Sequence, residues 1–239
     1  MATHVIWDWN GTLLGDTDVV LQATNAALAK LHSSPPGLIG PGVPPLTAAQ
    51  YQAAFARPLE LFYANIFGRE ITSEEFLRLH EFFRDSYQER MAACELNRGA
   101  HEVLAYLKTQ GSTQSLLSLW THPELLQRIA QFGLTDYFVR VDGRPHTGVE
   151  GLDGKTEPLR RHVEYLRTSR ETGSQVSDPA PEYVLIGDSL DDAVAARANG
   201  VRCVLFASGI HTPAALTATG LPVAHTLHQA VEVAEGLAS

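Results

Sequence analysis

Residues 4–16 read HVIWDWNGTLLGD, and the fold is decided where this apolar run meets Asp8. The β-branched and aromatic residues of HVIWDW predict a buried strand. The strand ends on a carboxylate, and a Gly11-Thr12 turn follows it directly. Because ligands of open α/β sheets bind beyond the carboxyl ends of the strands, Asp8 and Asn10 are the first candidate site residues.

Composition narrows the possible classes of protein. A chain of 239 residues can bury a full core and carry one modest extra domain. A net charge of −9 with a pI near 5.5 argues against a nucleic-acid binder but leaves room for a local cationic pocket. Cys94 and Cys203 lack metal-ligand spacing and are expected to be free, buried thiols. With no leader-like start and no apolar run near 18 residues, we expect a cytoplasmic protein without a membrane segment.

Strand-like and helix-like runs alternate along most of the chain. We expect further strands at 113–120, 137–141, 182–188 and 201–206, and helices at 17–32, 99–110, 123–132, 157–169, 191–199 and 227–237. Residues 47–95 read as helical throughout, with Ser73 as the N-cap of the clearest helix, whereas 33–47 and 170–181 read as loops. This pattern predicts a Rossmann-like, doubly wound α/β core from residues 1–15 and 96–239, with an all-helical cap inserted at 16–95.

Polar residues cluster at four predicted strand ends. Each cluster alone is explained by helix capping or by surface charge, but four at the same sheet edge predict a site. The clusters are Asp8 with Asn10, Ser118 with Thr121 and His122, Lys155 before a helix, and GDSLDD at 187–192.

These clusters resemble the motifs of the haloacid dehalogenase-like hydrolase superfamily, in the branch similar to phosphoglycolate phosphatase. DWNGTL at 8–13 matches the first motif except at position 10. Ser118, followed by PELLQRIAQFGL, is similar to the second motif, and Lys155 with Pro158 to the third. IGDSLDDAVAARANGV at 186–201 resembles the fourth motif closely. The resemblance implies a Mg²⁺-dependent phosphatase that acts on a small phosphorylated metabolite.

The resemblance also implies a role for each motif residue. Asp8 is the nucleophile that forms an aspartyl-phosphate, while a cation and a lysine offset the repulsion between carboxylate and phosphate. The expected Mg²⁺ ligands are Asp8, the backbone carbonyl of Asn10, Asp188 and, directly or through water, Asp192. The expected phosphate-binding groups are Lys155, Ser118 and the backbone N–H groups around Gly11 and Thr12.

Asn10 is the departure from the family pattern, which has a second aspartate there as general acid and base. An amide keeps the backbone carbonyl for the metal but transfers no proton at neutral pH. Either the leaving group needs little protonation, as in an acyl or aryl phosphate, or another side chain substitutes, or turnover is slow. The candidate substitutes are His122, Asp16 and Asp18. If position 10 limits the reaction, Asn10→Asp should raise the turnover of a simple alkyl phosphate.

The cap is expected to supply specificity, with Arg57 and Arg69 as possible partners of a substrate anion. Trp7 and Trp9 alternate with Asp8 along the strand, so their rings should pack away from the carboxylate. Neither a membrane nor a nucleic acid is an expected partner, and the protein should be a monomer or a homodimer.

Three other functions stay open at the level of sequence. A carbon–halogen hydrolase of the superfamily dispenses with the metal, so the acids at 188 and 192 count against it. A phosphonate-cleaving enzyme needs a cap lysine, and the one lysine between residues 17 and 95 is Lys30. A phosphate-binding regulator would keep the pocket but show little turnover.

Overall fold

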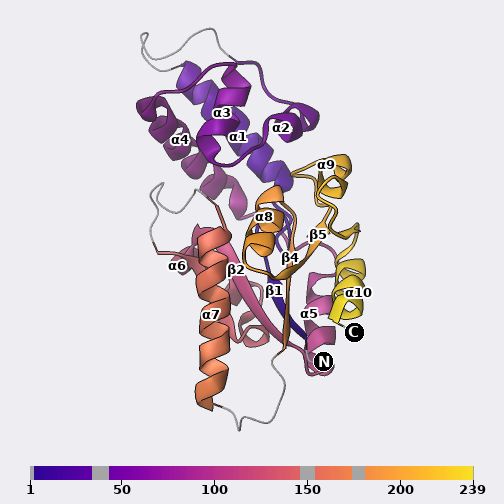
Figure 1. Cartoon of the computed structure of the whole chain (residues 1–239). Coiled ribbons are helices and arrows are strands. Elements are labelled where there is room, and N and C mark those ends of the chain that lie inside the picture. The colour runs from indigo at the N-terminus through magenta and orange to yellow at the C-terminus, as the bar shows by residue number, and fades with distance from the viewer. Residues whose placement is uncertain (1–2, 34–42, 146–153, 174–180, 239) are drawn as a thin grey trace.

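The computed structural model describes residues 3–33, 43–145, 154–173 and 181–238. The loops expected at 33–47 and 170–181 lie mostly outside these ranges, but residues 170–173 are helical and not part of a loop. Six strands form one parallel sheet in the order β3-β2-β1-β4-β5-β6, with β1 near the middle (Figure 1). The strands are β1 (Thr3–Trp7), β2 (Thr113–Thr121), β3 (Arg140–Arg144), β4 (Glu182–Gly187), β5 (Arg202–Phe206) and β6 (Val223–Ala224). This is the doubly wound architecture that the sequence predicts.

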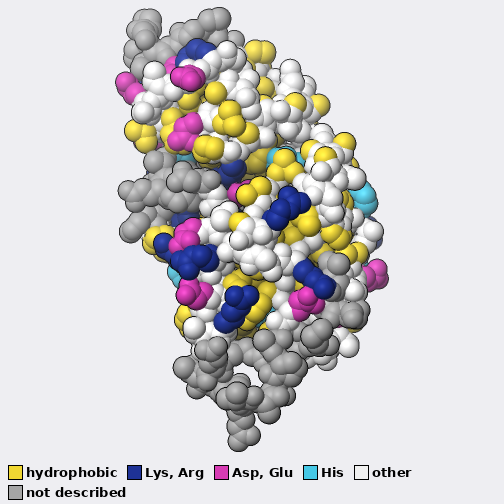
Figure 2. Space-filling view, viewed as in Figure 1, with side chains coloured by type: hydrophobic (Ala, Val, Ile, Leu, Met, Phe, Trp, Pro, Cys, Tyr) yellow, Lys and Arg dark blue, Asp and Glu magenta, His cyan; other side chains and the backbone are white. Residues whose placement is uncertain are grey.

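Helices cover both faces of the sheet, because alternate residues of the central strands point to opposite sides. Val5 and Trp7 of β1 pack with the helices of one face, and Ile6 packs with those of the other. The first face carries α5 (Ala100–Thr109), α6 (His122–Gln131) and α10 (Leu227–Ala238). The second carries α7 (Thr156–Gly173), α8 (Leu190–Ala198) and α9 (Pro213–Thr217). On the face drawn in Figure 2, basic and acidic side chains are interspersed along α7, where Arg160 pairs with Glu157 and Glu164.

Four helices between β1 and α5, here called the cap helices, form a separate layer. They are α1 (Thr17–His32), α2 (Ala48–Ala54), α3 (Leu59–Phe67) and α4 (Ser73–Met91). They enclose their own apolar cluster, in which α1 packs along α4. In Figure 1 the cap helices lie above the sheet, at the end opposite the two chain termini. They therefore face the carboxyl ends of the strands, where the polar clusters were predicted to meet.

Several element boundaries differ from the sequence-based expectation. The N-cap of α4 is Thr72 rather than Ser73, because Thr72 and Glu75 form a reciprocal capping box. The third strand begins at Arg140, where its pairing with β2 starts, whereas Tyr137 lies in a short 3-10 turn. The short elements α9 and β6 were not predicted. In contrast, α1 spans 17–32 as expected.

Two further expectations concern burial. Trp7 and Trp9 are both fully buried in the core, as predicted. Cys94 and Cys203 are free and buried. Across the described ranges, no helix is both long enough and apolar enough to cross a bilayer.

Candidate active site

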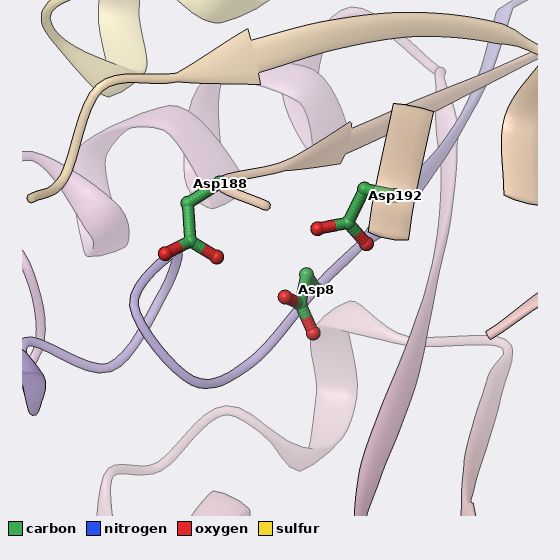
Figure 3. Close-up of side chains that lie close together, drawn as sticks. All are labelled: Asp8, Asp188 and Asp192. Carbon is green, nitrogen blue, oxygen red and sulfur yellow. The ribbon is translucent and has the colours of Figure 1, made fainter. Parts of the chain in front are cut away.

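Three carboxylates from different parts of the chain converge at the middle of the sheet. Asp8 follows β1, Asp188 follows β4, and Asp192 lies in the first turn of α8. β1 and β4 are neighbours, and the N–H of Asp8 donates to the carbonyl of Ile186 at 2.9 Å. One oxygen from each carboxylate lies within 4.8 Å of the others, and Figure 3 shows the three groups turned toward one another. The sheet order reverses at this pair of strands, which is where open α/β sheets bind ligands.

Lys155 places one positive charge against these carboxylates. Its Nζ lies 2.8 Å from Asp8 Oδ1 and 2.5 Å from Asp192 Oδ1. The lysine is 4% exposed, and its backbone N–H donates to Asp191. Three buried acids beside a single buried base leave an excess of negative charge, which a low-dielectric site tolerates only with protons or with a further cation.

Burial and the neighbouring charges shift the pKa values of all three carboxylates. Burial raises the pKa of Asp8 to about 7, although Lys155 acts in the opposite direction. Burial also raises the pKa of Asp188 well above its usual value, and the neighbouring Asp8 adds to the effect. For Asp192, burial is outweighed by Lys155 and by hydrogen bonds from Ser189, which lower its pKa. Asp8 and Asp188 are therefore the carboxylates that gain most from an added cation.

The donor atoms suit a hard divalent cation, which prefers carboxylate and carbonyl oxygens. The loop after β1 leaves space for Asp188 only because residue 11 is glycine. A Cβ on Gly11 would lie 2.1 Å from Asp188 Oδ2, and the φ of +74° also favours glycine. Asp192 is more committed, since Oδ1 contacts Lys155 and Oδ2 accepts from the N–H and hydroxyl of Ser189. Asp192 thus holds Lys155 in place as well as lying beside the candidate metal position.

Three of the groups that are expected to bind phosphate form hydrogen bonds to other groups of the protein. The N–H of Gly11 donates to Asp16 Oδ1 at 2.7 Å, and the N–H of Thr12 donates to the carbonyl of Trp9 at 3.2 Å. The Ser118 hydroxyl donates to Asn10 Oδ1 at 3.3 Å. A phosphate-binding role for these groups stays a prediction, and it requires these hydrogen bonds to be exchanged for bonds to the substrate.

The amide of Asn10 is held on both sides. Its Nδ2 donates to Asp16 Oδ2 and contacts the Tyr87 hydroxyl, both at 2.9 Å, while its Oδ1 accepts from Ser118. Tyr87 Oη also donates to Asp16 Oδ2 at 2.6 Å. A carboxylate at position 10 would face the carboxylate of Asp16 at hydrogen-bonding distance. Asparagine therefore suits position 10, because its amide N–H donates a hydrogen bond to Asp16, whereas a second carboxylate there would repel the carboxylate of Asp16.

Of the three candidate substitutes for the missing acid, Asp16 lies beside Asn10. It occupies the N-cap position of α1 but does not cap the helix, because its side chain turns toward Gly11, Asn10 and Tyr87. Burial raises the pKa of Asp16. The other two candidates lie elsewhere: Asp18 is exposed, and His122 Nδ1 accepts from the N–H of Gly143 at 3.3 Å.

The model of the haloacid dehalogenase-like hydrolase family matches residues 5–206, which contain every residue of the site described above. The chain belongs to the haloacid dehalogenase-like hydrolases. Two curated relatives are both described as phosphoglycolate phosphatase. The protein from Pseudomonas fluorescens is 26% identical over 86% of this chain and 69% of its own length. The protein from Cupriavidus necator is 27% identical over 92% of this chain and 87% of its own length.

Solved structures of other hydrolase-like proteins share the fold. A predicted phosphatase from Clostridium acetobutylicum superposes with a TM-score of 0.73 at 18% identity, over 99% of this chain and 98% of its own. A predicted phosphoglycolate phosphatase from Haemophilus somnus gives a TM-score of 0.67 at 16% identity, over 97% of each chain. At this level of identity the likeness establishes the fold and leaves the substrate open.

In this haloacid dehalogenase-like hydrolase, a cavity of about 220 Å³ lies between the cap helices and the sheet. Asn10 and Asp16 line it on the side of the sheet. Arg57 lines this cavity and also a neighbouring opening, and its pairing with a substrate anion stays a prediction. Arg69 instead forms a two-point ion pair with Glu75, at 2.6 and 3.1 Å, and does not line either space.

Three side chains of the hydrolase's site were not found by sequence reasoning. Tyr87 reaches Asp16 from 71 positions away along the chain. Asn97 Nδ2 donates to the carbonyls of Gly11 and Thr12, which fixes the loop after β1. Ser208 Oγ donates to Asp188 Oδ2 at 2.7 Å. No local pattern marks them, since each reaches the site through a hydrogen bond to a residue that is distant in sequence.

Proposed function

We propose that this hydrolase is a Mg²⁺-dependent phosphatase of a small phosphorylated metabolite and that it works through an aspartyl-phosphate on Asp8. The observation that carries the proposal is the buried contact of Asp8 with Lys155 beside Asp188, at the reversal point of the sheet. A nucleophilic carboxylate, a fixed cation and a second acid for metal binding are the parts that phosphoryl transfer from an ester requires.

In the first half of the reaction, an oxygen of Asp8 attacks phosphorus and the ester P–O bond breaks. The alcohol leaves with the electron pair of that bond and takes up a proton. In the second half, water attacks the aspartyl-phosphate, which releases phosphate and restores Asp8. Lys155 offsets phosphoryl charge as a point cation, and its contact with Asp192 keeps it in position.

Mg²⁺ would be held by Asp8, Asp188 and the backbone carbonyl of Asn10, with Asp192 as a further direct or water-mediated ligand. When bound, it supplies charge neutralisation for the phosphoryl oxygens. The absence of a Cβ at Gly11 and the excess of buried negative charge support this assignment.

We assign the proton-transfer role, which Asn10 cannot fill, to Asp16. Its carboxylate lies 2.9 Å from the Asn10 amide, lines the cavity, and is positioned by Tyr87 of α4. General acid–base help of this kind is typically worth about 10²–10⁴-fold in rate.

Phosphoglycolate is the first metabolite to assay, because curated relatives are described as phosphoglycolate phosphatases. We expect the protein to act in the cytoplasm, as a monomer or a homodimer.

The test is phosphate release from p-nitrophenyl phosphate and acetyl phosphate, with Mg²⁺ and then with EDTA. Asp8→Asn should abolish phosphate release, because the nucleophile is lost. It should also abolish the increase in protein mass that an aspartyl-phosphate gives when the reaction is stopped with acid. Asp18→Asn is the matched control, since Asp18 is an exposed acid in the same segment. Metal-independent release, or release that survives in Asp8→Asn, would contradict the proposal. Tight phosphate binding without any phosphate release would favour the alternative function of a phosphate-binding regulator.

A further inference from the structure

The cavity between cap and sheet differs in character from the carboxylate site beside it. Asn10 lines the cavity while Asp8, two residues earlier, faces the metal position. A phosphoryl group bound at Asp8 therefore directs the rest of its ester past Asn10 and into this space. The chemistry of the cavity wall then decides which alcohol the enzyme releases.

The cap side of the wall is rich in aromatic side chains, and the polar side chains of Arg57, His80, Arg84 and Gln88 also line it. Six Phe and Tyr side chains from the cap helices and the α2–α3 connection line it: Tyr51, Phe55, Phe62, Tyr63, Phe83 and Tyr87. Two pairs meet edge to face, as Phe55 and Phe62 do with ring centroids 5.5 Å apart, and two other pairs are stacked. Trp120 adds a ring from the sheet side, and its ring meets that of Tyr87 at 5.9 Å. Rings arranged in this way present edges and faces that a further aromatic ring can join.

Polar groups on the sheet side of the wall are partly occupied by one another. Both oxygens of Glu124 accept hydrogen bonds, from Gln88 at 2.8 Å, from Trp120 at 2.8 Å and from Thr121. Arg144 Nε donates to the carbonyl of Leu119 at 2.5 Å. A hydrophilic tail entering here has to compete with these bonds, whereas an apolar tail leaves them intact.

The size of the cavity also exceeds the needs of a two-carbon acid. Its volume is about 220 Å³, and an apolar cavity of roughly 150 Å³ already admits benzene. In Figure 2, hydrophobic side chains are visible where the cap meets the rest of the molecule. The space therefore fits an alcohol with one ring or a short branched chain.

Building on the proposed phosphatase function, we propose that this site selects phosphate monoesters whose alcohol carries an aromatic or comparably apolar group, held by the aromatic wall of the cap. The charged site recognises the phosphoryl end, and the wall recognises the apolar end. Excluding water from one ring is worth at least about tenfold in specificity, because even a single methylene in a fitted pocket reaches that range.

The experiment compares kcat/KM for ethyl phosphate, butyl phosphate, 2-phenylethyl phosphate and phosphoglycolate. The first three are primary alkyl esters with similar leaving groups, so differences among them report binding of the tail. We expect 2-phenylethyl phosphate to exceed ethyl phosphate and phosphoglycolate by at least about tenfold. Equal values, or a preference for phosphoglycolate, would overturn the inference while leaving the phosphatase in place. Absence of Asp8-dependent release from every ester, p-nitrophenyl phosphate included, would overturn the proposed function itself.

Substitutions in α4 test whether the rings that line the cavity cause the preference for 2-phenylethyl phosphate. Phe82 and Phe83 both pack against the apolar cluster of the cap helices, but of the two only Phe83 lines the cavity, and Phe82 lies near Lys30. Phe83→Ala should lower the 2-phenylethyl to ethyl preference by about tenfold, and Phe83→Leu should lower it less. Phe82→Ala is the matched control, with the same loss of a ring from the same helix. An equal loss of preference in Phe82→Ala and Phe83→Ala would overturn the inference, because it would trace the effect to cap stability.

Discussion

The side chain at position 10 is favoured by its hydrogen-bond partners as well as by the reaction. Its amide donates toward Asp16 and accepts from Ser118, and Tyr87 contacts the same amide nitrogen. Sequence comparison with the family pattern marks position 10 as a lost acid. The structure shows another acid, Asp16, at hydrogen-bonding distance from that position.

The neighbouring Asp16 changes the expected result of Asn10→Asp. That single substitution puts two carboxyl groups in contact, so they would share one proton instead of adding a second acid. Exchanging the two residues is the sharper experiment. Asp16→Asn should lower kcat for ethyl phosphate by about 10²-fold, with a much smaller effect on p-nitrophenyl phosphate, whose leaving group needs little protonation. The double variant Asn10→Asp/Asp16→Asn should recover most of the ethyl phosphate rate.

Steady-state kinetics with both substrates check this prediction, and circular dichroism verifies the fold. Equal losses for the two substrates in Asp16→Asn would mean that Asp16 only positions Asn10. A double variant that fails to recover the ethyl phosphate rate would also assign Asp16 a positioning role alone.

At the scale of single elements, the start of α4 is fixed by contacts among residues that are close in sequence. Thr72 and Glu75 form the capping box, and Glu75 also receives the two-point contact from Arg69. The hydrogen bond from Arg69 lowers the pKa of Glu75 to about 2. The cap helix that carries Tyr87 and Phe83 is anchored at this end.

Glu75→Gln should lower the free energy of unfolding by about 1 kcal/mol at pH 7, a value discounted because Arg69 is partly exposed. Since the folded pKa lies below the unfolded value, the contribution is complete above about pH 4.5 and is lost as the pH falls toward 2. Urea unfolding at pH 7 and pH 3.5 should thus show a smaller difference from wild type at the lower pH. Glu74→Gln, at an exposed acid in the same turn, is the control. A difference that stays constant with pH would rule out the ionic contribution.

At the scale of the whole molecule, the sheet brings together acids that are 180 positions apart. Asp8 and Asp188 end neighbouring strands, and the cap helices lie over that edge. The result is a buried cluster of side chains with more negative than positive charge. Beside it lies the cavity that is lined by aromatic side chains of the cap. Stability and metal binding should be linked in such a site.

Saturating Mg²⁺ should raise the melting temperature, because a ligand present at 100 times its Kd stabilises the folded state by about 2.7 kcal/mol. For a chain of this size that corresponds to a shift of roughly 5–10 °C. Asp188→Asn should remove most of the shift, since it deletes a ligand, whereas Asp191→Asn next to it should retain it. Differential scanning calorimetry with Mg²⁺ and with EDTA makes the measurement. An equal shift in Asp188→Asn would place the ion elsewhere.

The sequence by itself determined the alternation of strands and helices, the strand ends that carry Asp8 and Asp188, and the extent of α1. These features depend on local periodicity, on glycine turns and on the position of polar residues after apolar runs, all of which lie within a few residues of one another. The first residue of α4 and the start of β3 were misplaced, because a reciprocal cap and the pairing with β2 decided them.

Only the tertiary structure decided the partners of Asn10, the direction of Asp16 and the aromatic wall over the site. The sequence marks Asp16 as a possible substitute acid, but its side chain also accepts a hydrogen bond from Tyr87, 71 positions away. Likewise, the rings that line the cavity come from three cap helices, from the α2–α3 connection and from β2. Contacts between distant segments have no local signature, because they arise from packing of the whole chain.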